Sequence, residues 1–107
     1  IEQYEKALVL DPNDANVLSA LGGVYFNKGA DINNEANKLE FGDPNYDAMV
    51  AESKEFFKKS VPYLEKAVAA NPDECSYKEA LRDAYGKVGD VENFKKLKQE
   101  AADCKTK

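Results

Sequence analysis

Two carboxylates one helical turn apart, Glu79 and Asp83, are spaced for acid–base chemistry in this 107-residue sequence. Such a pair catalyses proton transfer only where an enclosed pocket shifts one of the two pKa values. The surrounding segment has the pattern of a surface helix, which offers no enclosure. The chain also lacks histidine, the commonest general base near neutral pH. The sequence therefore predicts no catalytic residues, no cofactor and no enzymatic activity.

A second polar group, the stretch DPNYDA at residues 43–48, places Asp, Asn and Asp at alternate positions, as a calcium-binding loop does. Its alanine stands where such a loop needs glycine, and Lys54 stands where the loop needs a bidentate glutamate. The simpler interpretation is a helix start, with Pro44 just inside the first turn. The chain is therefore predicted to hold no metal.

Cys75 and Cys104 are the remaining residues with distinctive chemistry. Between them, Gly89 and Asp90 mark a turn that folds this segment back on itself. Cys75 precedes Gly89 by 14 residues and Cys104 follows Asp90 by 14, so antiparallel pairing brings both cysteines to the same end. They either form a disulfide, which would indicate an oxidising compartment, or remain free thiols near the chain end. The spacing leaves both alternatives open.

Charge is distributed unevenly along the chain. The formal net charge of −5 argues against a nucleic-acid partner, because duplex binding needs a basic stripe. Residues 31–55 carry seven acidic and two basic side chains. This stretch is either a solvated face of two long helices or an acidic tip that meets a basic partner. No apolar run approaches the roughly 20 residues that span a bilayer, so no membrane span is predicted.

The elements that position these residues are helices, as a repeated phrase indicates. YEKALVLDPND at residues 4–14 returns as LEKAVAANPDE at residues 64–74. Each phrase has apolar residues on one helical face, then a proline that blocks continuation and polar residues that suit a new helix start. Each is therefore predicted to be a helix, a tight turn and a second helix. The apolar spacing also predicts two long antiparallel helices, about 13–39 and 44–70, packed along their full length.

A set of residues that share one register resembles the tetratricopeptide repeat, a helix–turn–helix unit of about 34 residues: Pro12, Leu18, Leu21, Gly22 and Tyr25. Because the repeated phrase returns after 60 residues, one unit would hold an insertion of about 26 residues. So short an insertion cannot build its own core, and it would instead lengthen both arms of one helical hairpin. The resemblance divides the chain into the second half of a repeat (1–14), an elongated repeat with this insertion (15–74) and a divergent terminal repeat (75–107).

The resemblance implies an all-α fold, a short α-solenoid of antiparallel helix hairpins with one hairpin elongated. It also implies a protein–protein interaction scaffold that binds an extended peptide or partner helix on a solenoid groove. The alternative is a structural terminal module that caps a larger protein of this family and has no ligand of its own. The concave surface of the family places the candidate partner-binding residues at Asn16, Ser19, Gly23, Phe26, Asn27, Ser76, Glu79, Asp83 and Lys87.

Two further expectations concern the ends of the array. Arg82 and Phe94 stand where the family has small residues, which leaves a close crossing of the last two helices open. Because the sequence begins inside a repeat, we expect it to be the C-terminal part of a longer protein. Tyr4 and Leu8 then lack one neighbour, so they are expected to contact either the longer chain or a second copy, which would give self-association through the first helix.

Overall fold

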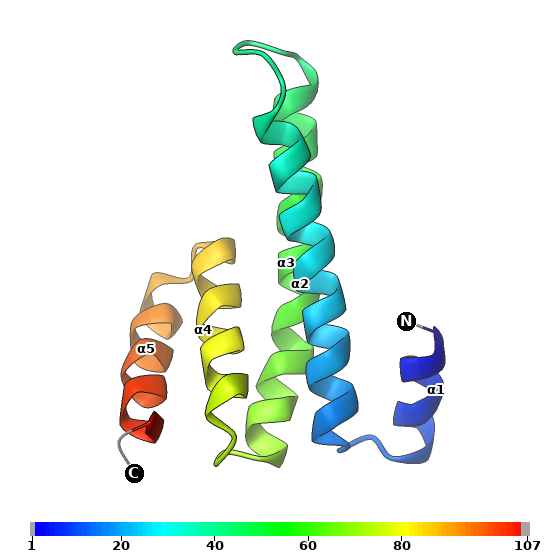
Figure 1. Ribbon diagram of the computed structural model, residues 1–107, viewed down its shortest axis with the longest axis vertical. Coiled ribbons are helices and arrows are strands. Elements are labelled where there is room, and N and C mark those ends of the chain that lie inside the picture. The colour runs from blue at the N-terminus through cyan, green and yellow to red at the C-terminus, as the bar shows by residue number, and fades with distance from the viewer. Residues whose placement is uncertain (1, 106–107) are drawn as a thin grey trace.

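The computed structural model describes residues 2–105, and within this range the chain forms five helices and no strand (Figure 1). The helices are antiparallel to their neighbours in the chain: α1 (Glu2–Leu10), α2 (Ala15–Asn37), α3 (Asn45–Ala70), α4 (Cys75–Val88) and α5 (Val91–Lys105). The all-α, helical-repeat architecture expected from the sequence is therefore confirmed. None of these helices is both long and apolar enough to cross a membrane.

Short polar turns separate successive helices. The Asp14 carboxylate accepts hydrogen bonds from the backbone N–H groups of Asn16, at 3.1 Å, and Val17, at 3.3 Å, which caps the start of α2. At the end of α4, Gly89 takes a left-handed φ of 80°. The Asp90 N–H then bonds back to a carbonyl of the last turn at 3.0 Å, so the turn predicted at Gly89 and Asp90 is confirmed.

The long hairpin predicted from apolar spacing is formed by α2 and α3, whose bounds differ from the predicted ones by at most two residues. A short connection, residues 38–44, holds no further element, and α3 continues through Pro62. At the start of α3, the Asp43 carboxylate accepts a hydrogen bond from the Asn45 N–H at 2.8 Å. The stretch is a helix start, as predicted, with Pro44 at the N-cap rather than inside the first turn. The hairpin runs along the 46 Å axis of the molecule and protrudes beyond the other helices (Figure 1).

Small residues let the two arms of this hairpin approach closely. A Cβ built on Gly22 would lie 2.6 Å from two atoms of Leu64, and one built on Gly29 would lie 2.9 Å from the Phe57 ring. The buried Ser53 hydroxyl donates a hydrogen bond to the Gly29 carbonyl oxygen at 2.7 Å. The glycines of α2 therefore make room for large side chains of α3, Leu64 and Phe57, and a buried serine hydrogen bond joins the two arms.

An apolar core joins the hairpin to the last two helices and contains Leu64, Leu81, Ala84, Tyr85 and Leu97.

Arg82 and Phe94, which stand where the family has small residues, left open whether α4 and α5 cross closely. A Cβ on Gly86 would lie 3.2 Å from the Phe94 ring, so the ring packs against α4 at a glycine one turn beyond Arg82. The close crossing is kept, at a different position.

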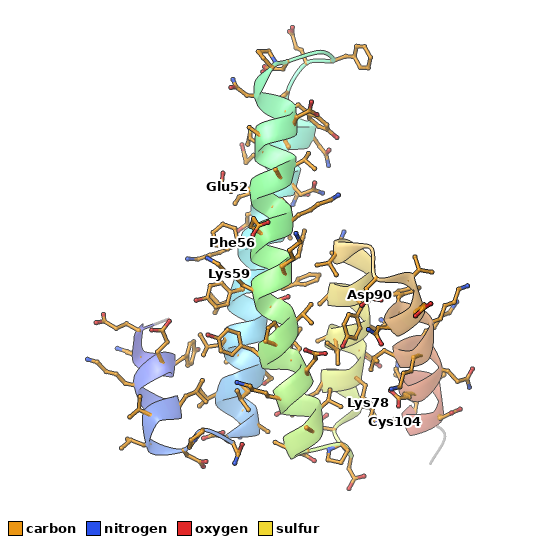
Figure 2. All side chains as sticks on the ribbon, turned by 180° about the vertical axis from the view of Figure 1, so that it is seen from behind. Glu52, Phe56, Lys59, Lys78, Asp90 and Cys104 are labelled. Carbon is orange, nitrogen blue, oxygen red and sulfur yellow. A yellow bond between two sulfur atoms is a disulfide. The ribbon has the colours of Figure 1, made fainter. Side chains whose placement is uncertain are left out.

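A disulfide between Cys75, at the start of α4, and Cys104, near the end of α5, joins the two helices; the two Cα atoms lie 5.7 Å apart (Figure 2). An ion pair between Lys105 and Glu79 lies near the same end. The bond links the two helices opposite their connecting turn, so the terminal hairpin is held at both ends.

The first helix is the least buried element of the described chain. No residue of α1 is buried, and Tyr4, Val9 and Leu10 are 38%, 82% and 89% exposed. Leu8 is half-buried. Because α1 packs mainly beside α2 (Figure 1), most of its apolar surface faces solvent in this chain.

Candidate peptide-binding groove

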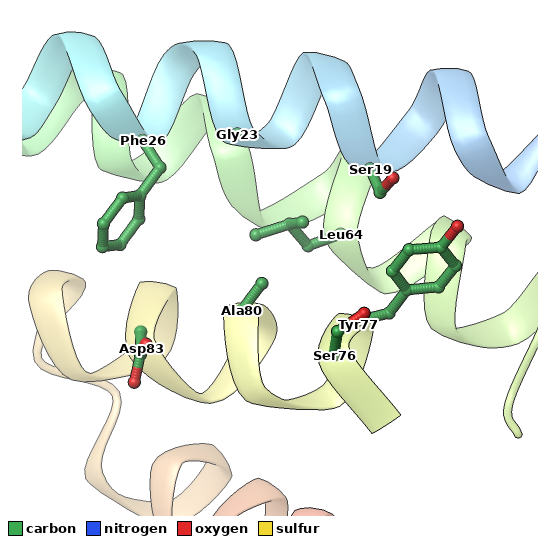
Figure 3. Close-up of a pocket in the computed structure, with 8 residues that line it drawn as sticks. All are labelled: Ser19, Gly23, Phe26, Leu64, Ser76, Tyr77, Ala80 and Asp83. Atoms are coloured by element: carbon green, nitrogen blue, oxygen red, sulfur yellow. The ribbon is translucent and has the colours of Figure 1, made fainter. Parts of the chain in front are cut away.

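An open hollow of about 300 Å³ lies between α2 and α4, with α3 behind it (Figure 3). Phe26, Leu64 and Ala80 point toward one another across this space and give it an apolar centre. Hydroxyl groups and one carboxylate lie around that centre. We call it the α2–α4 groove, and its lining consists of Ser19, Gly23, Phe26, Leu64, Ser76, Tyr77, Ala80 and Asp83.

Two adjacent glycines create the groove by opposite means. Gly22 is buried against Leu64, and the absence of a Cβ there lets the leucine reach the floor from α3. Gly23 faces the open side, where an added Cβ would meet nothing within 4 Å. A larger residue at Gly23 would therefore fill the groove, whereas one at Gly22 would push against the core.

One end of the groove is closed by a hydrogen bond between helices far apart in sequence. The Tyr77 hydroxyl on α4 donates to the Asn16 side-chain oxygen on α2 at 2.9 Å. The Ser19 hydroxyl donates to the Asn16 carbonyl at 3.0 Å, and the Ser76 hydroxyl donates to the Glu74 carboxylate at 3.0 Å. Both serine oxygens can still accept hydrogen bonds, so this end offers acceptors to a ligand's backbone N–H groups.

The opposite end carries the charge of the groove. The Asp83 side chain is 51% exposed and lies 3.0 Å from the Arg82 guanidinium. The Lys87 ammonium lies 5.8 Å from the centre of the Phe57 ring, which packs edge-on against Phe26 at 5.0 Å between centroids. An exposed ion pair of this kind contributes little to folding, so Asp83 can exchange Arg82 for a cationic group of a ligand.

Candidate partner-binding residues from α2 and from α4 meet in this groove. Among the nine candidate partner-binding residues, its lining includes Ser19, Gly23, Phe26, Ser76 and Asp83. The other four lie elsewhere: Asn16 holds Tyr77, Lys87 lies over Phe57, Asn27 is exposed outside the lining, and Glu79 pairs with Lys105 of α5.

The sequence reasoning missed three lining residues. Ala80 lies four positions after the predicted Ser76, on the same face of α4, so helical spacing could have found it. Tyr77 is next to Ser76 in the sequence, and adjacent helical positions do not share a face, so spacing from Ser76 does not predict it. Leu64 comes from α3 and contributes only because it passes over Gly22. The glycine is the only signal for it in the sequence.

Glu79 and Asp83, the two carboxylates spaced for acid–base chemistry, lie on different surfaces. Lys105 hydrogen-bonds to Glu79 and holds the pKa of that carboxyl below its ordinary value. Asp83 faces the groove instead. Within residues 2–105, no group of three or more cysteine, aspartate or glutamate side chains is placed to hold a metal ion.

A second hollow, of about 400 Å³, lies on the α1 side of the hairpin and is lined by aromatic and basic residues. Tyr25 stacks with Tyr63 and Phe56 at 5.7 and 6.4 Å between ring centroids, and the Lys59 ammonium lies 5.4 Å from the Phe56 ring (Figure 2). Burial, followed by the charges of Tyr63 and Glu5, raises the pKa of the Tyr25 hydroxyl. This hollow is close to α1, and none of its residues was singled out for partner binding.

Comparison with known proteins gives one family match. The model of the family described as TPR repeat matches residues 1–29, which cover α1 and the part of α2 that borders the groove. No curated protein matches the chain. Repeats of this kind generally mediate protein–protein interactions, and the family is typically a non-enzymatic scaffold.

Proposed function

We propose that this chain is a tetratricopeptide-repeat protein and binds an extended peptide or a partner helix in the α2–α4 groove. The observation that carries the proposal is an apolar centre left open between two helices and flanked by unused acceptors. A chain gains no folding stability from apolar surface that stays in water, whereas a ligand that covers it gains about 25 cal/mol per Å². We infer that the groove is a ligand surface rather than a packing defect.

The chemistry of the groove supports peptide recognition over catalysis. Its lining has a single carboxylate, Asp83, together with two serine hydroxyls and one tyrosine hydroxyl, and no histidine or lysine. A peptide can place an apolar side chain against Phe26 and Ala80, backbone N–H groups near the serines and a basic residue near Asp83. We therefore infer that the chain is a binding module and not an enzyme.

The division into repeats supports the same proposal. We infer that residues 15–74 form one elongated repeat, that residues 75–107 form the terminal repeat, and that residues 1–14 are the second half of another. The groove then lies between the first helices of two successive repeats. The alternative role, a terminal cap without a ligand, is supported by the polar outer face of α5, where Lys95, Lys96, Lys98 and Gln99 are exposed.

Self-association through α1 is a separate proposal. It is supported by the exposure of Tyr4, Val9 and Leu10 on a helix without a buried residue. Sedimentation of the chain over a range of concentrations tests it. A dimer that Val9→Ser weakens is expected, and a monomer at every concentration would contradict it.

The peptide-binding proposal is tested by filling the groove. A random peptide library is selected against the wild-type chain, and the selected peptides are titrated against wild type and Gly23→Leu. Because Gly23 faces open space, the leucine should occupy the hollow without disturbing the core. We expect the peptides to bind the variant at least about tenfold more weakly, which corresponds to about 1.4 kcal/mol.

Gly23→Ala is the matched control, because its methyl group leaves most of the hollow open. It should bind within about twofold of wild type, which is about 0.4 kcal/mol. If the peptides bind Gly23→Leu as tightly as wild type, the groove is not their binding site. A library that yields no groove-dependent peptide would favour the terminal-cap alternative.

A further inference from the structure

We propose that the protruding end of the α2–α3 hairpin is a second docking surface, which receives a protein segment with an apolar side chain flanked by lysine or arginine. This surface is separate from the α2–α4 groove, and the proposal does not depend on the function proposed for that groove. We call it the hairpin tip and define it by the residues that line its hollow: Asn37, Leu39, Glu40, Phe41, Gly42, Asp43, Pro44, Tyr46 and Asp47.

The tip is hollow and largely apolar. Its hollow has a volume of about 570 Å³ and is bordered by the side chains of Leu39, Phe41, Pro44 and Tyr46. Phe41 is fully exposed, and Tyr46 is 41% exposed. Since the tip stands clear of every other helix (Figure 1), no part of the described chain covers these rings.

The exposure of Phe41 comes from a defined turn. Gly42 has a φ of +86°, a backbone conformation that glycine adopts easily. The Asp43 N–H bonds to the Glu40 carbonyl at 3.0 Å, and the Asp43 carboxylate caps α3 through Asn45. The turn therefore presents the phenylalanine ring outward, where it contributes nothing to folding and is available to a partner.

Charge identifies the chemistry of the occupant. The seven acidic and two basic residues of the segment 31–55 give it a net charge of −5, which equals the net charge of the whole chain. The chain has 20 acidic and 15 basic residues, so the remainder holds 13 of each and is neutral. The excess negative charge therefore lies entirely on the protruding hairpin.

All the charged side chains that line the hollow of the tip are acidic. Glu40, Asp43 and Asp47 border the hollow, and no basic residue does. Lys38, which is next to the hollow in sequence, is paired with Glu35 at 2.9 Å. An apolar hollow with three carboxylates repels nucleic acid and anionic lipid and attracts lysine and arginine. A basic protein segment with a central apolar residue satisfies both features.

The experiment uses three capped peptides as probes: Lys-Lys-Leu-Lys-Lys, its glutamine analogue Gln-Gln-Leu-Gln-Gln, and its acidic analogue Glu-Glu-Leu-Glu-Glu. Each is titrated into the isotope-labelled full chain at millimolar concentration, and amide chemical shifts are followed by NMR. We expect the basic peptide to shift amides of residues 37–47. The glutamine peptide should bind at least about threefold more weakly, since each exposed ion pair contributes modestly.

Substitutions separate the contribution of the Phe41 ring from that of the acidic side chains. Phe41→Ser should abolish the tip shifts, whereas Val91→Ser, which alters an exposed apolar residue at the start of α5, should leave them unchanged. The double variant Glu40→Lys with Asp47→Lys should lose the basic peptide and gain the acidic one. Circular dichroism of each variant confirms that the helices are retained.

Three outcomes would overturn the proposal. The first is no shift at residues 37–47 with the basic peptide at millimolar concentration. The second is a shift there that Phe41→Ser does not change. The third is selective broadening of the tip amides by phosphatidylcholine vesicles with no response to the basic peptide, which would assign Phe41 to a lipid surface instead.

Discussion

Replacing Gly22 and Gly23 by alanine, one at a time, should have opposite effects on stability. Both glycines lie inside α2, so both substitutions gain the helix propensity of alanine, about 1 kcal/mol. At Gly23 nothing lies within 4 Å of the new Cβ, so this gain should appear in full. At Gly22 the new Cβ would lie 2.6 Å from Cγ and Cδ2 of Leu64, which is 1% exposed and cannot swing aside.

The difference between the two variants isolates the clash, because the propensity terms cancel. Forcing one extra carbon into a packed core destabilises a protein by about 1–3 kcal/mol. We therefore expect Gly22→Ala to be about 1–3 kcal/mol less stable than Gly23→Ala, and Gly23→Ala to be more stable than wild type. For a domain of this size, such a difference corresponds to a melting-temperature gap of roughly 4 °C or more.

The assay is urea unfolding followed by far-ultraviolet circular dichroism, with the three chains compared in one buffer. Gly29→Ala serves as a second clash variant, because its Cβ would lie 2.9 Å from the Phe57 ring and 3.0 Å from a backbone oxygen of Ser53. It should fall on the destabilised side with Gly22→Ala. Equal unfolding midpoints for Gly22→Ala and Gly23→Ala would refute this account of how α2 and α3 pack.

Three further predictions follow from individual contacts. Unfolded, unreduced protein should show no free thiol, and reduction of the Cys75–Cys104 disulfide should lower the free energy of unfolding by about 3–4 kcal/mol; two reactive thiols per chain would contradict it. Ser53→Ala, which removes a buried hydrogen bond between the hairpin arms, should cost about 0.5–1.5 kcal/mol in urea unfolding, and an unchanged midpoint would count against that bond. Burial and a hydrogen bond to the Glu65 carboxylate raise the pKa of Tyr85 above its ordinary value of 10. As the pH passes 10, this tyrosine therefore ionises in the unfolded state but not in the folded state. The stability advantage of wild type over Tyr85→Phe should shrink above that pH, and an advantage that stays constant would contradict the prediction.

The sequence predicted the helices because their signals are local. Apolar spacing located both arms of the hairpin, and Pro12 and Pro72 lie at the turns that precede α2 and α4. The five candidates that line the groove needed only the repeat register to be found: Ser19, Gly23 and Phe26 on α2, and Ser76 and Asp83 on α4. These features depend on residues that are close in the chain.

Features that depend on contacts between distant segments were not accessible in this way. Glu79 has the same register position as other groove candidates, but Lys105 lies across from it on α5 and pairs with it. Leu64 enters the groove because Gly22 leaves space, which requires knowing that α2 and α3 cross at that point. Register predicts which face a residue occupies, and only packing shows what it meets there.

The α2–α4 groove and the hairpin tip are far enough apart to act independently. Asn37 at the tip is eleven positions after Phe26 in the groove along α2, which at 1.5 Å per residue is about 17 Å. At physiological salt the Debye length is about 8 Å, so the carboxylates of the tip are largely screened from a ligand in the groove. Reversing the tip charges should therefore leave groove affinities unchanged, and filling the groove at Gly23 should leave the tip shifts unchanged. Gly29, Ser53 and Phe57 pack the two arms together between the groove and the tip, so the fold would allow one chain to hold both proposed partners at once.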